Sequence, residues 1–182
     1  MLIVLSPAKT LDYSVDPKSN HTAPQFLSQS SNLIKNLKDK EPKDIASLMG
    51  LSDKLAALNF DRYQSWKASK TVSNDSKPSM MVFKGDVYQG LDAESLNNKQ
   101  IKFAQKHLRI LSGLYGILRP MDVIKPYRLE MGTKLETSKG KNLYDFWGDA
   151  IQKNVLKDLE SQKSDLLINL ASKEYFTVLG KM

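Results

Sequence analysis

The chain has 182 residues, of which 41% are hydrophobic and 26% charged, a composition typical of one globular domain with its own core. It contains no cysteine, which excludes disulfides, thiolate metal sites and cysteine nucleophiles. The formal net charge is +7, and residues 61–140 carry most of the excess, with 14 basic and 8 acidic side chains. This excess fits either an anionic partner or solvated lysines on helix faces.

The first half of the chain predicts one strand followed by helices. Residues 1–5, MLIVL, form a continuous apolar run that predicts a short buried strand, and the run is too short for a signal peptide or a membrane span. Apolar residues at helical spacing predict a helix within 24–40. Residues 41–66 predict two helices broken at Gly50.

The second half predicts strands that alternate with helices. Residues 79–85, SMMVFKG, predict a second apolar strand. Residues 97–113 predict a helix, although the end of this run is equally compatible with a strand. Residues 128–136 predict a strand, 142–162 one amphipathic helix, and 165–172 a third buried strand. This alternation predicts an α/β (α+β mixed) fold, in which helices flank a mixed β-sheet.

Small, polar and charged residues follow three of the predicted strands. In α/β sheets, ligand sites assemble beyond the carboxyl ends of parallel strands. If the three strands are parallel neighbours, the residues expected to converge are Lys9, Thr10, Lys84, Asp86, Asn169, Ser172, Lys173 and Glu174. The alternative is three unrelated surface turns.

Residues 45–59, IASLMGLSDKLAALN, have the pattern of a helix-hairpin-helix element. Gly50 supplies the tight turn, and Ser52 or Asp53 begins a second helix whose N-terminal amides suit a phosphate. Lys54 adds a positive charge nearby. The alternative is an ordinary helix–turn–helix connection without a ligand.

Residues 111–132, LSGLYGILRPMDVIKPYRLEMG, combine glycines, prolines, tyrosines and arginines with large apolar side chains. We interpret this segment as the rigid wall of a cleft. Arg119, Lys125 and Arg128 would present charge, and Tyr115 and Tyr127 would stack on bases. The alternative is a structural Arg128–Glu130 ion pair inside an irregular core connection.

Asp86 lies between two glycines in KGDVYQG, residues 84–90. It would serve as a general base or a magnesium ligand, or else close a turn through its own backbone. The two histidines, His21 and His107, have no carboxylate at metal-ligand spacing, so we expect no metal site.

Five phrases stand in order along the chain: SPAKTLD (6–12), FKGDVYQGLDAE (83–94), LSGLYGILRPMDVIKPYRLEMG (111–132), LYDFWGD (143–149) and NLASKEYF (169–176). Together they resemble the peroxide stress resistance protein YaaA family, over almost the whole chain. The chain is therefore expected to form a single YaaA-like domain, residues 1–182. Members of the family usually continue into a further strand-rich, basic segment, so we expect this domain to be C-terminally incomplete.

The resemblance implies a cytoplasmic bacterial protein of the hydrogen peroxide response, which limits DNA damage and free intracellular iron. It also implies binding of double-stranded or distorted DNA in a basic cleft, with help from a helix-hairpin-helix. We expect no cofactor, no membrane contact and no stable protein partner. The residues expected to bind nucleic acid are Lys9, Thr10, Gly50, Ser52, Lys54, Lys84, Arg119, Lys125, Tyr127, Arg128 and Lys173.

The alternative function is an enzyme that acts on a small anionic or nucleotide-like substrate in the same cleft. Its catalytic residues would be Lys9, Asp86, Arg128, Glu130 and Glu174. Geometry separates the two hypotheses. A closed pocket in which these groups meet within hydrogen-bond reach favours the enzyme, whereas an open basic groove favours DNA.

Overall fold

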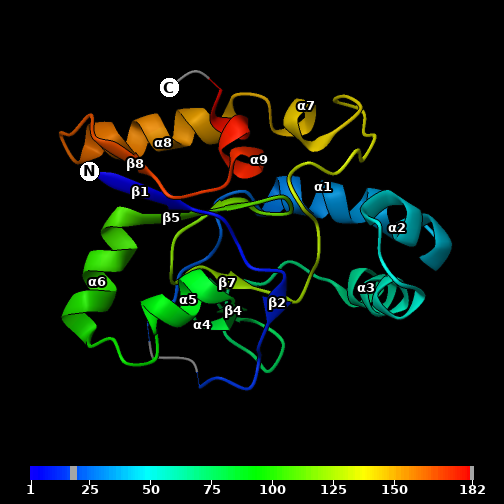
Figure 1. Ribbon diagram of the computed structural model, residues 1–182, viewed down its shortest axis with the longest axis horizontal. Helices are drawn as coiled ribbons and strands as arrows, with labels where there is room; N and C mark the ends of the chain where they lie inside the picture. Colours follow the sequence, from blue (N-terminus) through cyan, green and yellow to red (C-terminus); the bar gives the residue numbers. More distant parts are fainter. Residues whose placement is uncertain (17–19, 181–182) are drawn as a thin grey trace.

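The computed structural model describes residues 1–16 and 20–180, and a four-stranded mixed sheet lies at its centre (Figure 1). The strand order is β6-β5-β1-β8. The strands are β1 (Leu2–Leu5), β5 (Leu108–Ser112), β6 (Gly116–Leu118) and β8 (Leu167–Asn169). β1 pairs in parallel with both β5 and β8, and β6 runs antiparallel to β5. The mixed α/β fold expected from the sequence is confirmed.

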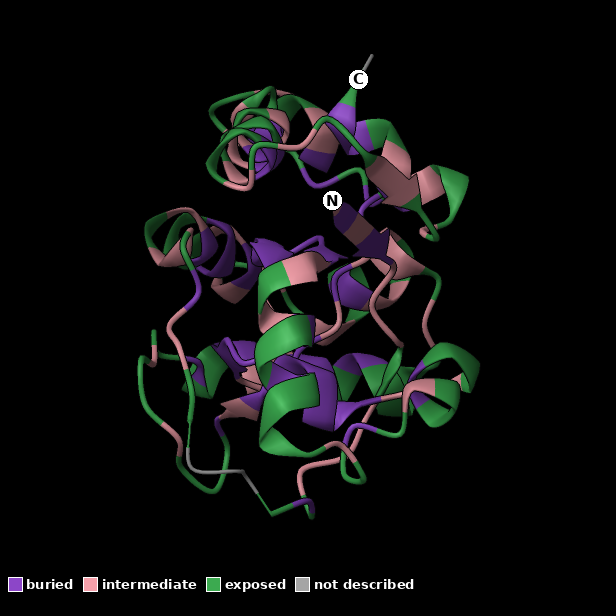
Figure 2. Cartoon of the chain, turned by 90° about the vertical axis from the view of Figure 1, so that its left-hand side faces the viewer, coloured by how far each residue is buried: buried purple, intermediate pink, exposed green. Residues whose placement is uncertain are grey.

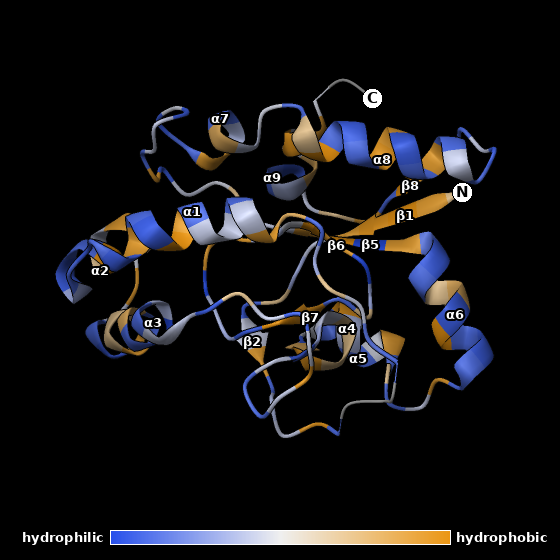
Figure 3. Cartoon of the chain, turned by 180° about the vertical axis from the view of Figure 1, so that it is seen from behind, coloured by the Kyte–Doolittle hydropathy of each residue, from blue (hydrophilic) through white to orange (hydrophobic). Residues whose placement is uncertain are grey.

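The central position of β1 explains its sequence. Both neighbours cover its edges, and three of its four side chains are buried. Figure 3 shows β1 coloured as hydrophobic along its length. A parallel strand with neighbours on both sides needs such a continuous apolar run. β8 lies at the edge of the sheet and its residues are half-buried or exposed, so the third strand is present but is not the buried strand expected.

Two small antiparallel pairs lie below the sheet in the view of Figure 1. β2 (Thr10–Leu11) pairs with β4 (Phe83–Lys84), and the register sets Thr10 opposite Lys84. β3 (Lys77–Pro78) pairs with β7 (Val123–Ile124). The first pair fixes the start of the chain against its middle, and the second joins two segments of the middle.

Helices surround the sheet, as expected. Figure 1 shows α8 along one side of the sheet, α6 at one end, and α1 to α3 at the other end. Figure 2 shows buried segments between these outer elements. The longer helices are α1 (Leu27–Lys38), α2 (Pro42–Met49), α3 (Asp53–Ser65), α6 (Asn98–His107) and α8 (Ala150–Ser161). The shorter ones are α4 (Ser79–Val82), α5 (Asp86–Leu91), α7 (Leu143–Trp147), α9 (Lys173–Phe176) and the 3-10 turn η1 (Thr177–Leu179). Among the described residues, no helix has the length and apolar character needed to cross a bilayer.

The strand expected over 79–85 is largely wrong, because its first four residues form α4 and only Phe83 and Lys84 are in a strand. The N–H of Ser79 donates to the carbonyl of Asp122 (2.9 Å), and that of Met80 donates to Pro120 (3.0 Å). These bonds hold the run as a helical turn under the 119–122 loop. A short buried apolar run does not by itself distinguish a helical turn from a strand.

The strand expected over 128–136 is also absent. Its buried and exposed residues alternate as in a strand, with Leu129, Met131 and Leu135 buried, but no strand of the described part of the chain pairs with it. The segment is instead an extended connection that packs against the sheet.

The expected boundaries of two helices also change. The helix expected over 97–113 ends at His107, and the remainder is β5, which was the alternative for this run. The helix expected over 142–162 is interrupted at Gly148, so that α7 and α8 are separate helices.

Candidate functional site

Two adjoining cavities, together called the cleft here, open at the carboxyl ends of β1 and β8. Residues 6–9, which follow β1, line both cavities. The first cavity, of about 210 Å³, also contacts residues 127–130, Ser172, Glu174 and Tyr175. The backbone N–H of Ser172 donates to the hydroxyl oxygen of Ser6 (2.9 Å), which ties the two loops together. The expected convergence of polar strand ends therefore occurs for β1 and β8.

Glu130 lies between two cations in the first cavity. The Lys9 ammonium is 3.2 Å from Glu130 Oε2, and Arg128 Nη2 is 3.1 Å from Glu130 Oε1. Lys9 is mostly exposed, whereas the other two side chains are mostly covered. The Arg128–Glu130 pair foreseen as the structural alternative is present, and Lys9 completes a three-membered charge cluster around the carboxylate.

Arg128 retains hydrogen-bonding capacity beyond this pair. Its Nε is buried and has no hydrogen-bond partner among the described residues. The backbone carbonyl of Arg128 accepts a hydrogen bond from the hydroxyl of Tyr63 in α3. Because Arg128 also lines the first cavity, its guanidinium places a positive charge beside the space that an anionic ligand would fill.

Glu174 closes one side of the first cavity. Its Oε1 accepts a hydrogen bond from the backbone N–H of Gly132 (2.8 Å), which links α9 to the wall segment 111–132. Tyr175, the next residue, is buried, and desolvation raises its pKa well above the usual value for tyrosine. Tyr175 therefore stays neutral at physiological pH.

The second cavity, of about 400 Å³, lies on the other side of residues 6–9. Thr10, Lys84 and Asp86 line it, so the strand-end residues of β4 join the cleft through pairing with β2 rather than through the central sheet. Lys84 forms an ion pair with Glu94 (3.0 Å). Asp86 is exposed in the first turn of α5.

Tyr88 of α5 holds the loop after β1 in place through a hydrogen bond. Its hydroxyl donates to the carbonyl of Ser6 (2.8 Å), and burial raises its pKa well above the usual tyrosine value. Sequence reasoning missed Tyr88 and Tyr175, because buried tyrosines carry no spacing pattern that marks them as part of a site. It also missed Tyr63, whose helical position indicated only core packing.

Two of the eight residues expected to converge at the strand ends, Asn169 and Lys173, lie outside the cleft lining. Asn169 turns back on its own loop, where its side-chain oxygen accepts from the N–H of Ala171 (2.8 Å). Lys173 is exposed at the start of α9.

The α2–α3 hairpin lies beyond the wall segment. Gly50 ends α2 in the left-handed conformation (φ 60°, ψ 43°), and α3 begins after Ser52. The two helices expected around Gly50 are therefore present. Ser52 caps α3 with its backbone only, because its side chain makes no capping hydrogen bond. Ser52, Asp53 and Lys54 are all exposed.

The tyrosines of the wall segment do not fit the stacking role expected of them. Tyr115 and Tyr127 are buried and contact one another edge to face at 5.3 Å. The hydroxyl of Tyr127 is 2.6 Å from that of Ser112, and the hydroxyl of Tyr115 accepts from Trp66 Nε1 (3.2 Å). These rings belong to the core, because their hydroxyls find partners inside it.

Arg119 and Lys125 also lie outside the cleft. Arg119 forms an ion pair with the fully buried Asp122 (2.8 Å) and lines a separate cavity. Lys125 pairs with Asp75 (2.6 Å), and this contact, with a hydrogen bond from Ser73, lowers the pKa of Asp75. Both cations are engaged in intramolecular pairs.

The cleft thus combines cations, carboxylates and backbone amides in a small space. It has the groups needed to hold an anion and to move a proton. Within residues 1–16 and 20–180, no three His, Cys, Asp or Glu side chains gather in a group that could hold a metal ion.

Comparison with known proteins gives one consistent match. The family model described as peroxide stress protein YaaA matches residues 1–181. A UPF0246 protein of Cupriavidus metallidurans is 54% identical over 183 residues, covering 98% of this chain and 70% of the relative. UPF0246 proteins of Aliivibrio fischeri strain MJ11 (54% identity; 97% of this chain and 68% of the relative) and Hahella chejuensis (52%; 100% and 71%) are similar over comparable lengths.

Proposed function

Because the chain belongs to the peroxide stress protein YaaA family, we propose that it protects DNA during hydrogen peroxide stress by binding the duplex directly. The α2–α3 hairpin, used as a helix-hairpin-helix, would grip the phosphate backbone, and the cleft would take a distorted or unpaired part of the strand.

The observation that carries this proposal is the exposed start of α3. The first backbone N–H groups of a helix have no intrahelical partners, and the Ser52 side chain occupies none of them. The left-handed Gly50 turn presents these groups beside exposed Lys54. A helix N-terminus next to a cation suits a phosphate.

The contact between Tyr63 and Arg128 connects the hairpin to the cleft. Tyr63 lies in α3, and its hydroxyl donates to the carbonyl of the residue that forms the cleft's charge cluster. A duplex bound at the start of α3 would therefore have a fixed position relative to Arg128 in the cleft. The basic excess of residues 61–140 would add nonspecific attraction.

Salt-titrated binding of a short duplex tests the proposal. The logarithm of the association constant should fall linearly with the logarithm of salt concentration, because cationic side chains that bind the DNA phosphates release counterions from them. Lys54→Ala should weaken binding and reduce the slope by about 1. Lys157→Ala, which removes an exposed lysine from α8, outside residues 61–140, is the matched control and should change neither. Equal losses in both variants, or no binding by the wild type, would contradict the proposal.

The proposed role includes the restriction of free intracellular iron that the resemblance implies. No residue is assigned to iron, because the described part of the chain offers no group of metal-ligating side chains. The iron effect would then be indirect. Measuring free iron in peroxide-treated cells with and without the gene tests this part separately from DNA binding.

The charge cluster favours a second candidate function, catalysis on a small anionic or nucleotide-like substrate. Lys9, Arg128 and Glu130 meet within hydrogen-bond reach in a cavity of about 210 Å³, which is far too small for a duplex. Glu174 lines the same cavity, and Asp86, the fifth residue of that hypothesis, lines the adjoining one. Turnover of nucleotides and phosphate esters that Glu130→Gln abolishes would establish this function, and duplex affinity retained in the same variant would show that the two functions are separate.

A further inference from the structure

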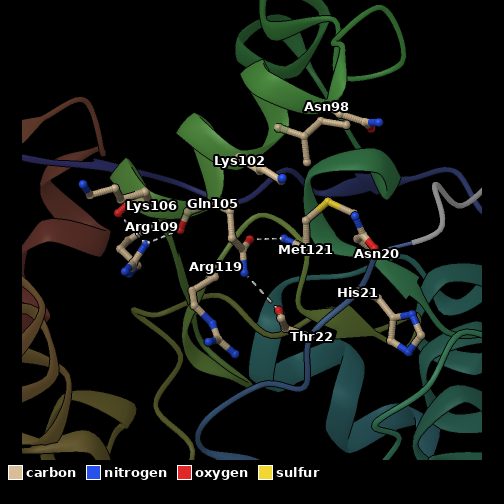
Figure 4. Close-up of a pocket in the computed structure, with 11 residues that line it drawn as sticks. Asn20, His21, Thr22, Asn98, Lys102, Gln105, Lys106, Arg109, Arg119 and Met121 are labelled. Carbon is tan, nitrogen blue, oxygen red and sulfur yellow. Dashed lines mark hydrogen bonds between the residues drawn. The ribbon is translucent and has the colours of Figure 1, made fainter.

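A cavity of about 380 Å³, called the basic cavity here, shares no lining residue with the cleft (Figure 4). It lies between α6, residues 20–22 and the loop after β6. Its size is within the range of small-molecule sites. Neither the family match nor the proposed DNA role uses it.

The lining of the basic cavity is strongly cationic. Among the described residues that line it, none is an aspartate or a glutamate, and the basic ones are His21, Lys102, Lys106, Arg109 and Arg119. Arg109 and Arg119 are balanced by Asp158 and Asp122. Lys102 and Lys106 form no ion pair within the described part of the chain, so the cavity keeps a net positive charge. In Figure 4 the Lys102 side chain points into the cavity, whereas that of Lys106 points away.

The polar groups of the cavity are held in place by their own partners. Gln105 Nε2 donates to Thr22 Oγ1 (3.1 Å), and Gln105 Oε1 accepts from the N–H of Met121 (2.8 Å). Arg119 is fixed by two nitrogens on the carboxylate of Asp122 and by the carbonyl of Ala23 (2.9 Å). Groups ordered before binding lose little entropy when a ligand arrives.

Part of the lining is apolar. Ile101 and Met121 are buried core residues whose surfaces reach the cavity. A site that held only an inorganic anion would not need this surface. Thioether and branched aliphatic side chains suit a flat ring or a hydrocarbon.

We propose that the basic cavity binds a small phosphate ester of mononucleotide size. Its phosphate would lie between the Lys102 ammonium and the Arg119 guanidinium, and its apolar part would rest on Ile101 and Met121. Phosphate fits because one ligand group can accept hydrogen bonds from both cations through different oxygens. The volume leaves room for a base or a ring beside the phosphate.

Calorimetric titration of the full chain with a nucleoside monophosphate, the matching nucleoside and inorganic phosphate tests this proposal. The nucleoside monophosphate should bind at least tenfold more tightly than either other probe, because each lacks one of the two recognised parts. Lys102→Glu should reduce its affinity tenfold or more. Lys99→Glu makes the same charge change one helical turn away and should reduce the affinity clearly less, because Lys99 does not line the cavity and cannot contact the ligand directly.

A second readout locates the ligand independently of affinity. In methyl NMR of the methionines, the Met121 signal, assigned by Met121→Leu, should move on addition of the nucleoside monophosphate. It should stay in place when short duplex DNA is added instead. Equal affinity in Lys102→Glu and Lys99→Glu, a Met121 signal that does not move, or no binding of the nucleoside monophosphate would each overturn the proposal. Failure here would leave salt-dependent duplex binding by the hairpin untouched.

Discussion

At the residue scale, two glycines serve different purposes. A Cβ at Gly113 would clash with the carbonyl oxygen of Leu129. The missing side chain therefore lets the backbone at Leu129 pack closely against the residue that follows β5. Gly50 has open space around it, and only its left-handed backbone favours glycine. The first glycine allows close packing, whereas the second allows a turn.

Gly50→Ala should lower the free energy of unfolding by about 1 kcal/mol, because an L side chain is strained in the left-handed region. Gly90→Ala is the matched control, since Gly90 lies in α5 with a negative φ and equally open space. It should be neutral or slightly stabilising. Urea denaturation of the unsubstituted protein and the two variants checks this. Equal losses of unfolding free energy in both variants would show that a side chain does not strain the Gly50 turn.

Arg128→Ala should weaken binding of an anionic ligand or DNA about tenfold or more, because Arg128 lines the cleft and its guanidinium is one of the two cations of the charge cluster. Lys125→Ala should have little effect on binding, since its ammonium is held by Asp75 outside the cleft lining. Fluorescence anisotropy with a labelled duplex compares the two. Loss of folding in Arg128→Ala alone would favour a purely structural Arg128–Glu130 pair, and Arg128→Lys then separates charge from the guanidinium fork.

The charge cluster could be foreseen from the sequence and the tyrosines could not. Arg128 and Glu130 are two residues apart in an extended segment, so they face the same side, and Lys9 follows a strand that had to end near them. The position of Tyr127 depended on Ser112 and Tyr115, which bury it through contacts that no local pattern records.

At the scale of elements, two tyrosine hydroxyls donate hydrogen bonds to backbone carbonyls that are distant in the sequence. Tyr63 of α3 donates to the carbonyl of Arg128, and Tyr13, after β2, donates to the carbonyl of Ile124 (2.9 Å). Both bonds join the N-terminal half of the chain to the 119–132 region. The first fixes the hairpin, and the second fixes the start of the chain.

Tyr63→Phe and Tyr13→Phe form a matched pair, because each removes one hydroxyl that donates to a backbone carbonyl. Both should lower the free energy of unfolding by about 1 kcal/mol. Only Tyr63→Phe should also weaken duplex binding, since it alone loosens the hairpin from the cleft wall. Equal DNA affinity in the two variants would mean that the hairpin and the cleft act separately.

Elements with a strong period were predictable, and elements defined by their partners were not. The apolar stripe of Leu33, Ile34 and Leu37 marks α1, and Gly50 marks the break between α2 and α3. Buried and exposed residues alternate over 128–136 as in a strand, but the segment does not form one. Strand pairing depends on a neighbouring strand that the local sequence does not specify. Whether the run at 79–82 is helical depended likewise on the distant carbonyls of Pro120 and Asp122.

At the scale of the whole molecule, the folded state raises the pKa of every tyrosine. Burial is the largest cause in each case, and the residues are Tyr13, Tyr63, Tyr88, Tyr115, Tyr127, Tyr144 and Tyr175. For Tyr115 the pKa rises to about 12. Each of these tyrosines therefore stays protonated in the folded protein at a pH at which it would begin to ionise in the unfolded chain.

Stability should fall steeply above about pH 10, because the unfolded tyrosines then lose protons that the folded ones keep. The contribution is complete below the unfolded pKa of about 10 and is lost as the pH rises through the folded values. Tyrosinate absorbance should stay low in the native protein at about pH 10.5 and rise together with unfolding. Native absorbance that follows the urea-unfolded protein would show that these rings are accessible to solvent.

The central position of β1 has a consequence for synthesis of the protein. Leu2 and Ile3 pair with Leu167 and Leu108, which leave the ribosome much later in synthesis. At bacterial elongation rates the second edge of β1 must wait roughly 10–30 s for its partner strand. During that interval an apolar strand with an unsatisfied edge is exposed, which is the kind of segment that chaperones capture. We therefore expect the nascent chain to depend on a chaperone until residue 169 has emerged, whereas the finished protein does not.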